Sequence, residues 1–301
     1  KIMEKLKKVT HYNLMKVVTL FILGVSHFLL SSGAIAADSG KMKIDDINMY
    51  YEVHGKGTPI ILIAGFTCDH TFWAGVLNQL AANHQVLTFD NRGIGQTDSP
   101  NTPYSIEMMA DDVMRLSKKL GLQDPIIIGQ SMGSAIAQNI GKRYPDQIQK
   151  IVLINTFAYL TKAPEMAFEL TGELQRMNLP LRYRVQSIAP WVFSSDFLSQ
   201  PNQLETLIRL AEQNPYPQSL IGYERQLNAL KEFNSGDWLS EIKTPALVIA
   251  GEEDMIAPLA GAKEVQKKIG NNTQLDVIPG GHASPVEQPQ KVADAILKFI
   301  D

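Results

Sequence analysis

The sequence predicts an α/β fold in which a mostly parallel sheet is covered by helices and carries an inserted helical cap. Short apolar runs rich in β-branched residues alternate with helical patterns up to residue 156 and again from residue 241. This alternation is typical of a parallel sheet with helices on both faces. Between residues 157 and 240 only helical spacing remains. We therefore predict a core domain made of residues 37–156 and 241–301, and a helical cap, or lid, at residues 157–240.

The first 36 residues are interpreted as a secretory signal peptide. Lysines up to Lys16 precede an apolar run from Val17 to Leu30, and small residues ending in Ala34-Ile35-Ala36 follow. A basic start, an apolar centre and an A-x-A end indicate cleavage, here after Ala36. We therefore expect export to the periplasm or the medium, with no stable membrane partner after cleavage. The alternative is an uncleaved N-terminal membrane anchor, for which about 20 apolar residues would be wanted.

The rest of the chain is acidic and has ordinary globular composition. Residues 37–301 hold 23 basic and 30 acidic residues, a net charge of −7. This charge argues against nucleic acid or an anionic membrane surface as a partner. Cys68 is the only cysteine, so no internal disulfide can form, and no patterned base accompanies it for a catalytic role. No metal-ligand or phosphate-binding pattern is present, so we expect neither a metal nor a cofactor.

Strands are predicted at the short apolar runs, the first of which alternates as the second strand of a hairpin. These runs are residues 44–52, 59–64, 86–89, 126–128, 151–154, 245–250 and 274–278. Helices are predicted where apolar residues recur every three or four positions. These segments are residues 70–80, 106–120, 259–269 and 292–300, with a further helix beginning near residue 135.

The stretch from residue 157 to residue 240 is expected to consist of short helices. Leucine and isoleucine recur at helical intervals at residues 204–208 and 220–230. Six prolines are expected to divide the stretch into pieces, because proline interrupts a helix. They are Pro164, Pro180, Pro190, Pro201, Pro215 and Pro217.

A candidate nucleophile lies where one predicted strand turns directly into a helix. The segment Gly129-Gln130-Ser131-Met132-Gly133 follows the strand at residues 126–128. Glycines two positions before and after Ser131 remove side chains that would clash in so sharp a turn. The Ser131 hydroxyl would then be exposed at a helix N-terminus, where free N–H groups can stabilise an oxyanion. The alternative is a tight turn around an unreactive serine, because so short a pattern also arises by chance.

A serine that attacks a carbonyl carbon needs a base, and the base needs an orienting carboxylate. Of the six histidines, only His282 follows a late strand, inside a glycine-rich turn. Asp254 lies four residues beyond the predicted strand end at Ala250 and is the candidate acid. The alternatives are a hydrogen-bonded loop histidine and a turn or capping aspartate. The order Ser131, Asp254, His282 is the one expected when a nucleophile stands on a strand-to-helix turn.

The oxyanion of such a reaction needs two N–H donors. One is expected from the backbone of Met132, directly after the nucleophile. The other is expected from the backbone of Phe66, in the loop after the strand at residues 59–64. Because both donors belong to the backbone, the neighbouring side chains are free to shape an acyl pocket.

With these segments in place, the sequence resembles the α/β-hydrolase fold family over about residues 42–301. The resemblance rests on residues 65–66, 90–95, 129–133, 251–254 and 281–282. The sequence is most similar to the group of capped esterases, enol-lactonases and cofactor-free haloperoxidases, which implies an α/β-hydrolase fold and serine-based catalysis. One departure is Ala64, where many members carry histidine before the glycine, and this change is expected to loosen the loop without removing activity.

Two further expectations come from this resemblance. Asp90 and Arg92 are expected to form a buried ion pair that braces their loop and takes no part in chemistry. Serine at position 131 argues against the dehalogenases and epoxide hydrolases of the family, which carry aspartate there.

The sequence thus predicts a serine hydrolase, a carboxylesterase that cleaves a small-molecule ester or thioester through an acyl-enzyme. Enol-lactone opening, C–C bond hydrolysis, peptide cleavage or perhydrolysis could use the same triad, and a non-catalytic binding protein is the remaining alternative. Trp191 and Phe193 are the candidate substrate-binding residues of an apolar acyl pocket. Four cap arginines could bind an acidic substrate, although simple surface solvation is expected of them. They are Arg176, Arg182, Arg184 and Arg225.

Overall fold

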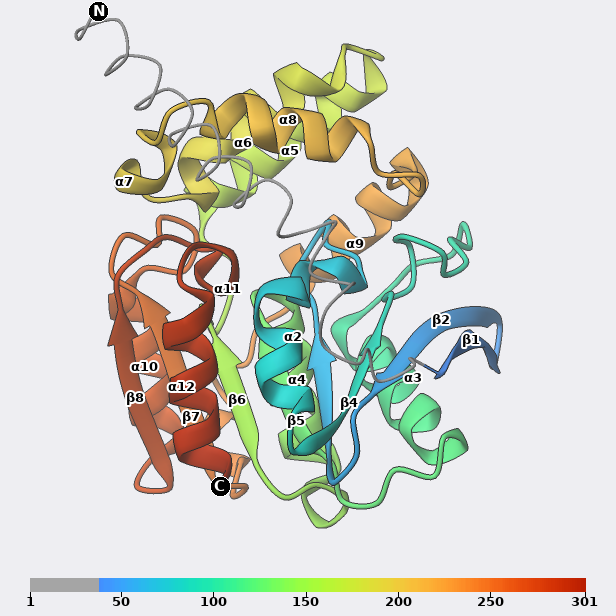
Figure 1. Cartoon of the computed structure of the whole chain (residues 1–301), viewed down its shortest axis with the longest axis vertical. Helices are drawn as coiled ribbons and strands as arrows, with labels where there is room; N and C mark the ends of the chain where they lie inside the picture. The colour runs from blue at the N-terminus through green and yellow to red at the C-terminus, as the bar shows by residue number, and fades with distance from the viewer. Residues whose placement is uncertain (1–37) are drawn as a thin grey trace, which may run out of the picture. The chain divides into compact units, whose positions relative to one another are not determined.

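The computed structural model of the protein describes residues 38–301. The predicted signal peptide and its cleavage site lie outside the described residues and stay a prediction. One eight-stranded sheet forms the centre of the molecule, in the order β1-β2-β4-β3-β5-β6-β7-β8 (Figure 1). The strands are β1 (Asp38–Ile44), β2 (Ile47–His54), β3 (Thr58–Ile63), β4 (His84–Phe89), β5 (Ile126–Gln130), β6 (Ile151–Ile154), β7 (Ala246–Gly251) and β8 (Thr273–Ile278).

Most of this sheet is parallel. Strand β2 pairs antiparallel with both β1 and β4, and every other neighbouring pair from β4 to β8 is parallel. The predicted α/β class with a mostly parallel sheet is therefore confirmed. The carboxyl ends of the parallel strands all meet at one edge of the sheet, where ligands of such folds bind.

The first hairpin differs from the prediction of one strand over residues 44–52. Strand β1 ends at Ile44, which pairs with Ile47 at the start of β2. The chain reverses through Asp45 and Asp46, and Asp45 has a φ of 45°. Aspartate tolerates this left-handed backbone better than most residues do. The two aspartates therefore mark a tight turn inside what the alternation alone presents as one strand.

Helices cover both faces of the sheet. One face carries α2 (Ala74–Ala81) and α12 (Pro289–Ile300), which contact each other, and the other carries α3 (Ile106–Lys119), α4 (Met132–Arg143) and α10 (Leu259–Ile269) (Figure 1). Strand side chains alternate between the two faces. Ile126 and Ile128 pack in the cluster under α2 and α12, whereas Ile127 packs in the cluster under α3 and α4. The short elements are η2 (His70–Trp73), η3 (Pro145–Gln147), η4 (Leu239–Glu241) and α11 (Ser284–Glu287).

Five further helices lie between β6 and β7, beyond one end of the sheet (Figure 1). They are α5 (Lys162–Arg176), α6 (Leu181–Val192), α7 (Ser195–Leu198), α8 (Gln203–Glu212) and α9 (Leu220–Glu232). We call residues 157–240 the cap. Two of the prolines do not divide helices as predicted. Pro164 stands in the first turn of α5, where its missing N–H has no helical acceptor to lose, and Pro190 lies inside α6, two residues before its end.

No helix within residues 38–301 is both long enough and apolar enough to cross a bilayer.

Candidate active site

Ser131 occupies the single-residue turn between β5 and α4, with a φ of 56° and a ψ of −120°. The two flanking glycines are required by contacts of the backbone. A Cβ at Gly129 would lie 2.0 Å from the carbonyl oxygen of Gly133, and a Cβ at Gly133 would lie 2.0 Å from that of Ile63. Because backbone atoms cannot swing away, no larger residue fits at either position. The turn therefore holds Ser131 at the carboxyl edge of the sheet, as the sequence pattern predicts.

The structure brings Ser131, His282 and Asp254 together in one hydrogen-bonded series. His282, in the loop after β8, has its Nε2 atom 2.7 Å from the Oγ atom of Ser131. Its Nδ1 atom lies 2.8 Å from Oδ2 and 3.0 Å from Oδ1 of Asp254, in the loop after β7. Each of the three residues is 5% exposed. This arrangement lets His282 accept the serine proton at Nε2 while Asp254 holds the Nδ1–H tautomer.

Two buried side chains that the sequence analysis missed hold this series in place. Asn155, directly after β6, donates from Nδ2 to Oδ2 of Asp254 over 2.8 Å. Gln130, directly before the serine, donates from Nε2 to the carbonyl oxygen of His282 over 2.8 Å. No sequence pattern names either residue. The available signal is that both are polar residues at the carboxyl end of a strand that is otherwise fully apolar or glycine.

Of the two predicted oxyanion donors, Met132 directly follows Ser131 in the chain, and Phe66 lines the same cavity as Ser131. Within residues 38–301, no backbone or side-chain acceptor engages the N–H of Phe66 or of Met132. The loop that carries Phe66 approaches the nucleophile closely, since a Cβ at Gly65 would lie 3.1 Å from the Cβ of Ser131. The next residue, Thr67, has a φ of 64°, and the Cys68 N–H donates to Gly65 across the turn. The loop is thus a strained, tight turn, and the N–H of Phe66 within it has no acceptor among the described residues.

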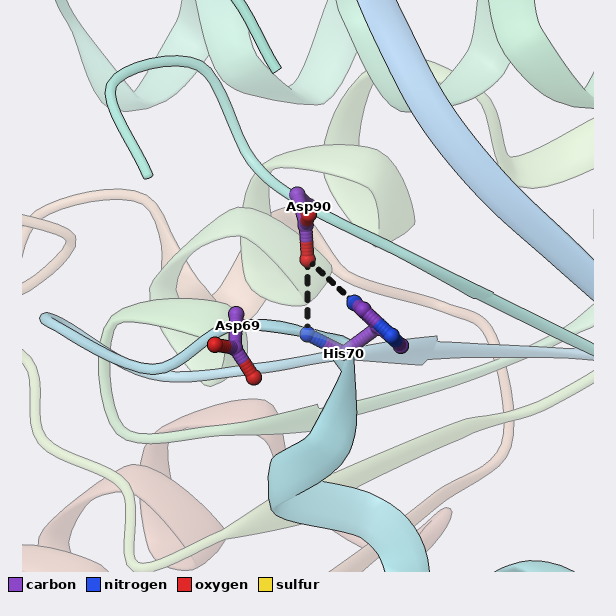
Figure 2. Close-up of side chains that lie close together, drawn as sticks. All are labelled: Asp69, His70 and Asp90. Carbon is purple, nitrogen blue, oxygen red and sulfur yellow. Dashed lines mark hydrogen bonds and ion pairs between the residues drawn. The ribbon is translucent and has the colours of Figure 1, made fainter. Parts of the chain in front are cut away.

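Side chains from the segment after β4 hold the loop that carries Phe66 in place. Asn91 donates to the carbonyl oxygen of Ala64 over 3.2 Å. One oxygen of Asp90 accepts from both the backbone N–H and the Nδ1–H of His70, each over 2.8 Å (Figure 2). The expected loosening at Ala64 is therefore opposed by direct bonds at both ends of the loop.

The charge on His70 strengthens this anchor. Burial disfavours the imidazolium, but hydrogen bonds to Asp90 and Glu52 outweigh burial and raise the pKa of His70 to about 10. At neutral pH the ring is therefore a cation between two carboxylates.

The predicted ion pair between Asp90 and Arg92 is wrong. Asp90 pairs with His70, whereas Arg92 points to the α3 side of the sheet. There its Nε atom lies 2.6 Å from Asp112 and its second amino group lies 3.2 Å from Asp46. Side chains two residues apart in this loop leave it in different directions, so each acid or base finds a separate partner.

Two other groups near the site carry side chains that could take part in other chemistry. Ligand atoms of Asp69, His70 and Asp90 lie within 4.8 Å of one another, the spacing that a metal ion could use (Figure 2). Asp69 already accepts from Thr71 and from Asn214 of the cap, and the nearer His70 nitrogen is bonded to Asp90. These hydrogen bonds assign the three residues to fastening the loop. Packing around the sulfur, together with Asp69, raises the pKa of Cys68 to about 12, so its thiol stays protonated.

A cavity of about 220 Å³ lies beside Ser131 and His282. Its walls are mostly apolar and come from both the core and the cap. They include Phe66, Phe168, Val185, Ile188, Val192 and Phe193. The ring of Phe66 lies edge-on to Phe168 at 5.2 Å, and 4.8 Å from Tyr223, so aromatic side chains close one side. Such a space suits an apolar group attached to a reacting carbonyl.

The structure separates the two predicted pocket residues. Phe193 lines the cavity, but Trp191 does not and packs beside the hydrophobic core instead. On helix α6 the neighbouring Val192 and Ile188 face the cavity, and a step of one residue turns a side chain by about 100°. The prediction for Trp191 is corrected accordingly.

The four cap arginines do not line the cavity. Three of them have polar partners near the surface: Arg176 with Glu173 and Glu224, Arg182 with Glu205, and Arg225 with Asn101. The positions of these three arginines agree better with solvated surface side chains than with a site that binds an acidic substrate.

Comparisons with known proteins give a consistent result. A profile described as alpha/beta hydrolase fold matches residues 58–289. RutD of Caulobacter sp. (strain K31), which carries the provisional name of carbamate hydrolase, is 28% identical over 258 residues, covering 84% of this chain and 95% of its own length. A thermophilic esterase from Thermogutta terrifontis is similar in structure, with a TM-score of 0.76, 26% identity, and coverage of 88% of this chain and 98% of its own. The enol-lactonase from Burkholderia xenovorans LB400, at 23% identity, a TM-score of 0.78 and coverage of 87% and 99%, is alike in fold.

Proposed function

The chain belongs to the alpha/beta hydrolase fold family, and we propose that it is a serine hydrolase that cleaves a small-molecule carboxylic ester, or thioester, through an acyl-enzyme. The observation that carries this proposal is the hydrogen-bonded series Ser131, His282 and Asp254, which opens on an apolar cavity. A serine hydroxyl bonded to a neutral imidazole is the arrangement that acyl transfer requires. The esterase of Thermogutta terrifontis, which is similar over nearly its full length, supports the same class.

The first half of the proposed reaction forms the acyl-enzyme. His282 takes the Ser131 proton at Nε2 while the serine Oγ atom attacks the ester carbonyl carbon. The carbonyl oxygen becomes an oxyanion, which the N–H groups of Phe66 and Met132 stabilise. The imidazolium then gives its proton to the leaving alkoxide or thiolate, and the bond from the carbonyl carbon to the leaving group breaks. Asp254 holds the ring through Nδ1 and stabilises the imidazolium each time it forms.

The second half returns the enzyme to its starting state. A water molecule takes the place of the leaving group, and His282 removes its proton as it attacks the acyl carbon. A second oxyanion forms and collapses, the bond to the Ser131 Oγ atom breaks, and the imidazolium returns the proton to that oxygen. The carboxylic acid is released. No step needs a redox group, since four proton transfers and two substitutions at carbon complete the balance.

The cavity supports a substrate with a short or medium acyl group. A volume of about 220 Å³ equals roughly seven groups of the size of a water molecule, at about 30 Å³ each. Each buried methylene stabilises a complex by about 0.8 kcal/mol, which is about fourfold in kcat/KM. We therefore expect kcat/KM to rise about fourfold per added carbon until the cavity is filled, and to fall beyond that length.

The nucleophile is tested with p-nitrophenyl esters from acetate to octanoate. Ser131→Ala and His282→Ala should each lower kcat by about 10⁴-fold or more, because either change removes the concerted attack. An organophosphonate ester should label the wild type once, at Ser131 by mass spectrometry, and should not label Ser131→Ala. Ester hydrolysis that survives in Ser131→Ala would overturn the proposal. Failure of every open-chain ester despite labelling would replace it with lactone or C–C bond hydrolysis.

The same ester series tests the cavity. Ile188→Ala removes three carbons from a wall residue on α6 and should move the preferred acyl chain to a longer length. Tyr183→Ala is the matched control, since Tyr183 is an exposed large side chain on the same helix. Its chain-length profile should equal that of the wild type. Equal profiles for Ile188→Ala and the wild type would show that the acyl group binds elsewhere.

A further inference from the structure

Asn155 is completely buried and lies at the carboxyl edge of the sheet, where the loops after β6, β7 and β8 meet. It directly follows β6, and its backbone N–H still pairs with Ile249 of β7. Its φ of 49° then turns the chain away from the sheet, a conformation that asparagine adopts more readily than most residues. The turn directs the side chain along the carboxyl edge, toward the loops that follow β7 and β8.

The amide of Asn155 connects these two loops. Its Nδ2 atom donates to Oδ2 of Asp254 over 2.8 Å and also lies 3.4 Å from the carbonyl oxygen of Gly281, next to His282. Its Oδ1 atom accepts from the hydroxyl of Ser284 over 2.6 Å. Asp254 fixes the orientation of the amide, because an ionised carboxylate can only accept and Nδ2 must therefore face it. The Ser284 hydroxyl then donates to Oδ1.

The hydrogen bonds around Asp254 define what this amide does chemically. Oδ1 accepts from the backbone N–H groups of Ile256 and Ala257, over 2.9 and 2.8 Å. Oδ2 accepts from Asn155 and from Nδ1 of His282. Four donors thus occupy the roughly four acceptor positions of one carboxylate. A proton moving from His282 to Oδ2 would have to displace the Asn155 amide or leave it without an acceptor.

We propose that Asn155 is a positioning residue of the catalytic series, which holds the carboxylate of Asp254 aimed at His282 and fixes the loops after β7 and β8 relative to each other. This inference rests on the proposed function, because it assigns Asn155 a role through Asp254 and His282. Asn155 touches neither substrate nor reacting atoms. It acts by holding the acid so that the imidazole keeps the tautomer that can accept the Ser131 proton.

The first test removes the amide without straining the backbone. Asn155→Gly is the suitable variant, since glycine adopts a φ of 49° freely. With p-nitrophenyl butyrate as substrate, kcat should fall by about 10- to 100-fold, the usual cost of losing such a supporting partner, while KM stays within about twofold. Phosphonate labelling of Ser131 should slow by the same factor as kcat.

The second test keeps the shape and changes the chemistry. Asn155→Asp places a carboxyl group where the amide lies 2.8 Å from Asp254, so the two carboxyl groups share one proton and the pKa of the introduced group is raised. While protonated, it can donate to Asp254 as the amide does. Once it ionises, the donor is lost and a second negative charge faces Asp254. The kcat of this variant should therefore fall as pH rises, over a range in which the wild-type kcat holds or increases.

The charged groups around this position come from the loops after β7 and β8 and from α11. Glu287 of α11 accepts from the N–H of Gly281, whose carbonyl oxygen lies 3.4 Å from Nδ2. In the described part of the chain, Asp254 is the titratable side chain that hydrogen-bonds the amide, and His282 lies behind it on the loop after β8. Ser284, the other side-chain partner, does not titrate in this range. A falling pH profile in Asn155→Asp therefore reports on the pair formed with Asp254. A loss of packing alone would lower kcat equally at every pH.

Asn139→Ala is the matched control. Asn139 is a buried asparagine of α4, and its Nδ2 atom has no hydrogen-bond partner in the described residues. This variant should keep the wild-type kcat and pH profile. An Asn155→Gly kcat within twofold of wild type, or a wild-type pH profile in Asn155→Asp, would overturn the inference. Should Asn155→Gly not fold, as judged by circular dichroism, the profile of Asn155→Asp decides alone.

Failure of this inference is distinguishable from failure of the proposed function. An inactive Ser131→Ala variant beside a fully active Asn155→Gly variant would remove the role of Asn155 only. Ester hydrolysis that survives in Ser131→Ala would remove the proposed function, and with it the role assigned here.

Discussion

The backbone of Ser131 stores strain that a substitution can release. Its φ of 56° and ψ of −120° lie where a Cβ atom clashes with neighbouring backbone, at a cost of about 1–3 kcal/mol. Ser131→Ala keeps the Cβ and hence this strain, whereas Ser131→Gly removes it. Glycine also gains freedom in the unfolded chain, which costs about 0.5–1 kcal/mol. The glycine variant should therefore be more stable than the alanine variant by about 1 kcal/mol.

The comparison of two inactive variants isolates the strain. Both lose the hydroxyl and its bond to His282, so any difference between them comes from the Cβ of residue 131. For a domain of this size, about 1 kcal/mol corresponds to a rise in Tm of about 2–4 °C. Urea unfolding at 25 °C and thermal unfolding by circular dichroism measure the two quantities. An alanine variant more stable than the glycine variant by the full unfolded-chain cost of glycine, about 0.5–1 kcal/mol, would refute the idea that the turn is strained.

Two further predictions concern stability. The pKa of His70 is raised above its unfolded value of about 6.5 to about 10, so its contribution to the free energy of unfolding is complete below about pH 6.5 and is lost as pH rises to about 10. Urea unfolding from pH 6 to 10 should show this decline, and His70→Asn should reduce it. Asp112→Asn should lower the free energy of unfolding by about 3–5 kcal/mol, because it leaves the guanidinium of Arg92, only 2% exposed, without its main partner. Glu264→Gln, at an exposed ion pair of α10, is the control and should cost at most about 1 kcal/mol.

The elements that the sequence predicts well are those with a regular apolar pattern, whether buried throughout, as in β6, or on one face only, as in α10. Strand β6 and helix α10 have the predicted bounds, at residues 151–154 and 259–269, because each is a regular apolar pattern with clear flanks. The first hairpin is less predictable, since its turn consists of two aspartates inside an alternating run. Pro190 is a similar case, because a proline near the end of a helix removes too few hydrogen bonds to break it.

The site shows the same division between local and long-range information. Ser131 could be placed from its own neighbours, because the glycines around it have a local steric reason. The pairing of Asp90 with His70 could not be predicted from neighbouring residues, because the two residues are 20 positions apart. Arg92, only two positions from Asp90, offers a basic side chain much nearer in the sequence. Asn155 is harder still. Its role exists only because the loops after β6, β7 and β8 meet at one edge, and no residue next to it in the chain indicates this.

The cap and the loop that carries His282 are bonded directly to each other, which under the proposed function has a consequence for selectivity. Ala283 donates to the carbonyl oxygen of Val192 over 3.0 Å, and Glu287 accepts from the backbone N–H groups of both Gly281 and Ser194. Val192 also lines the cavity, so one wall of the cavity is bonded to the residues on either side of His282. An acyl group that is too large must push this wall, and the wall carries the base with it. Because small displacements of a base slow proton transfer, poorly fitting esters should lose kcat as well as affinity.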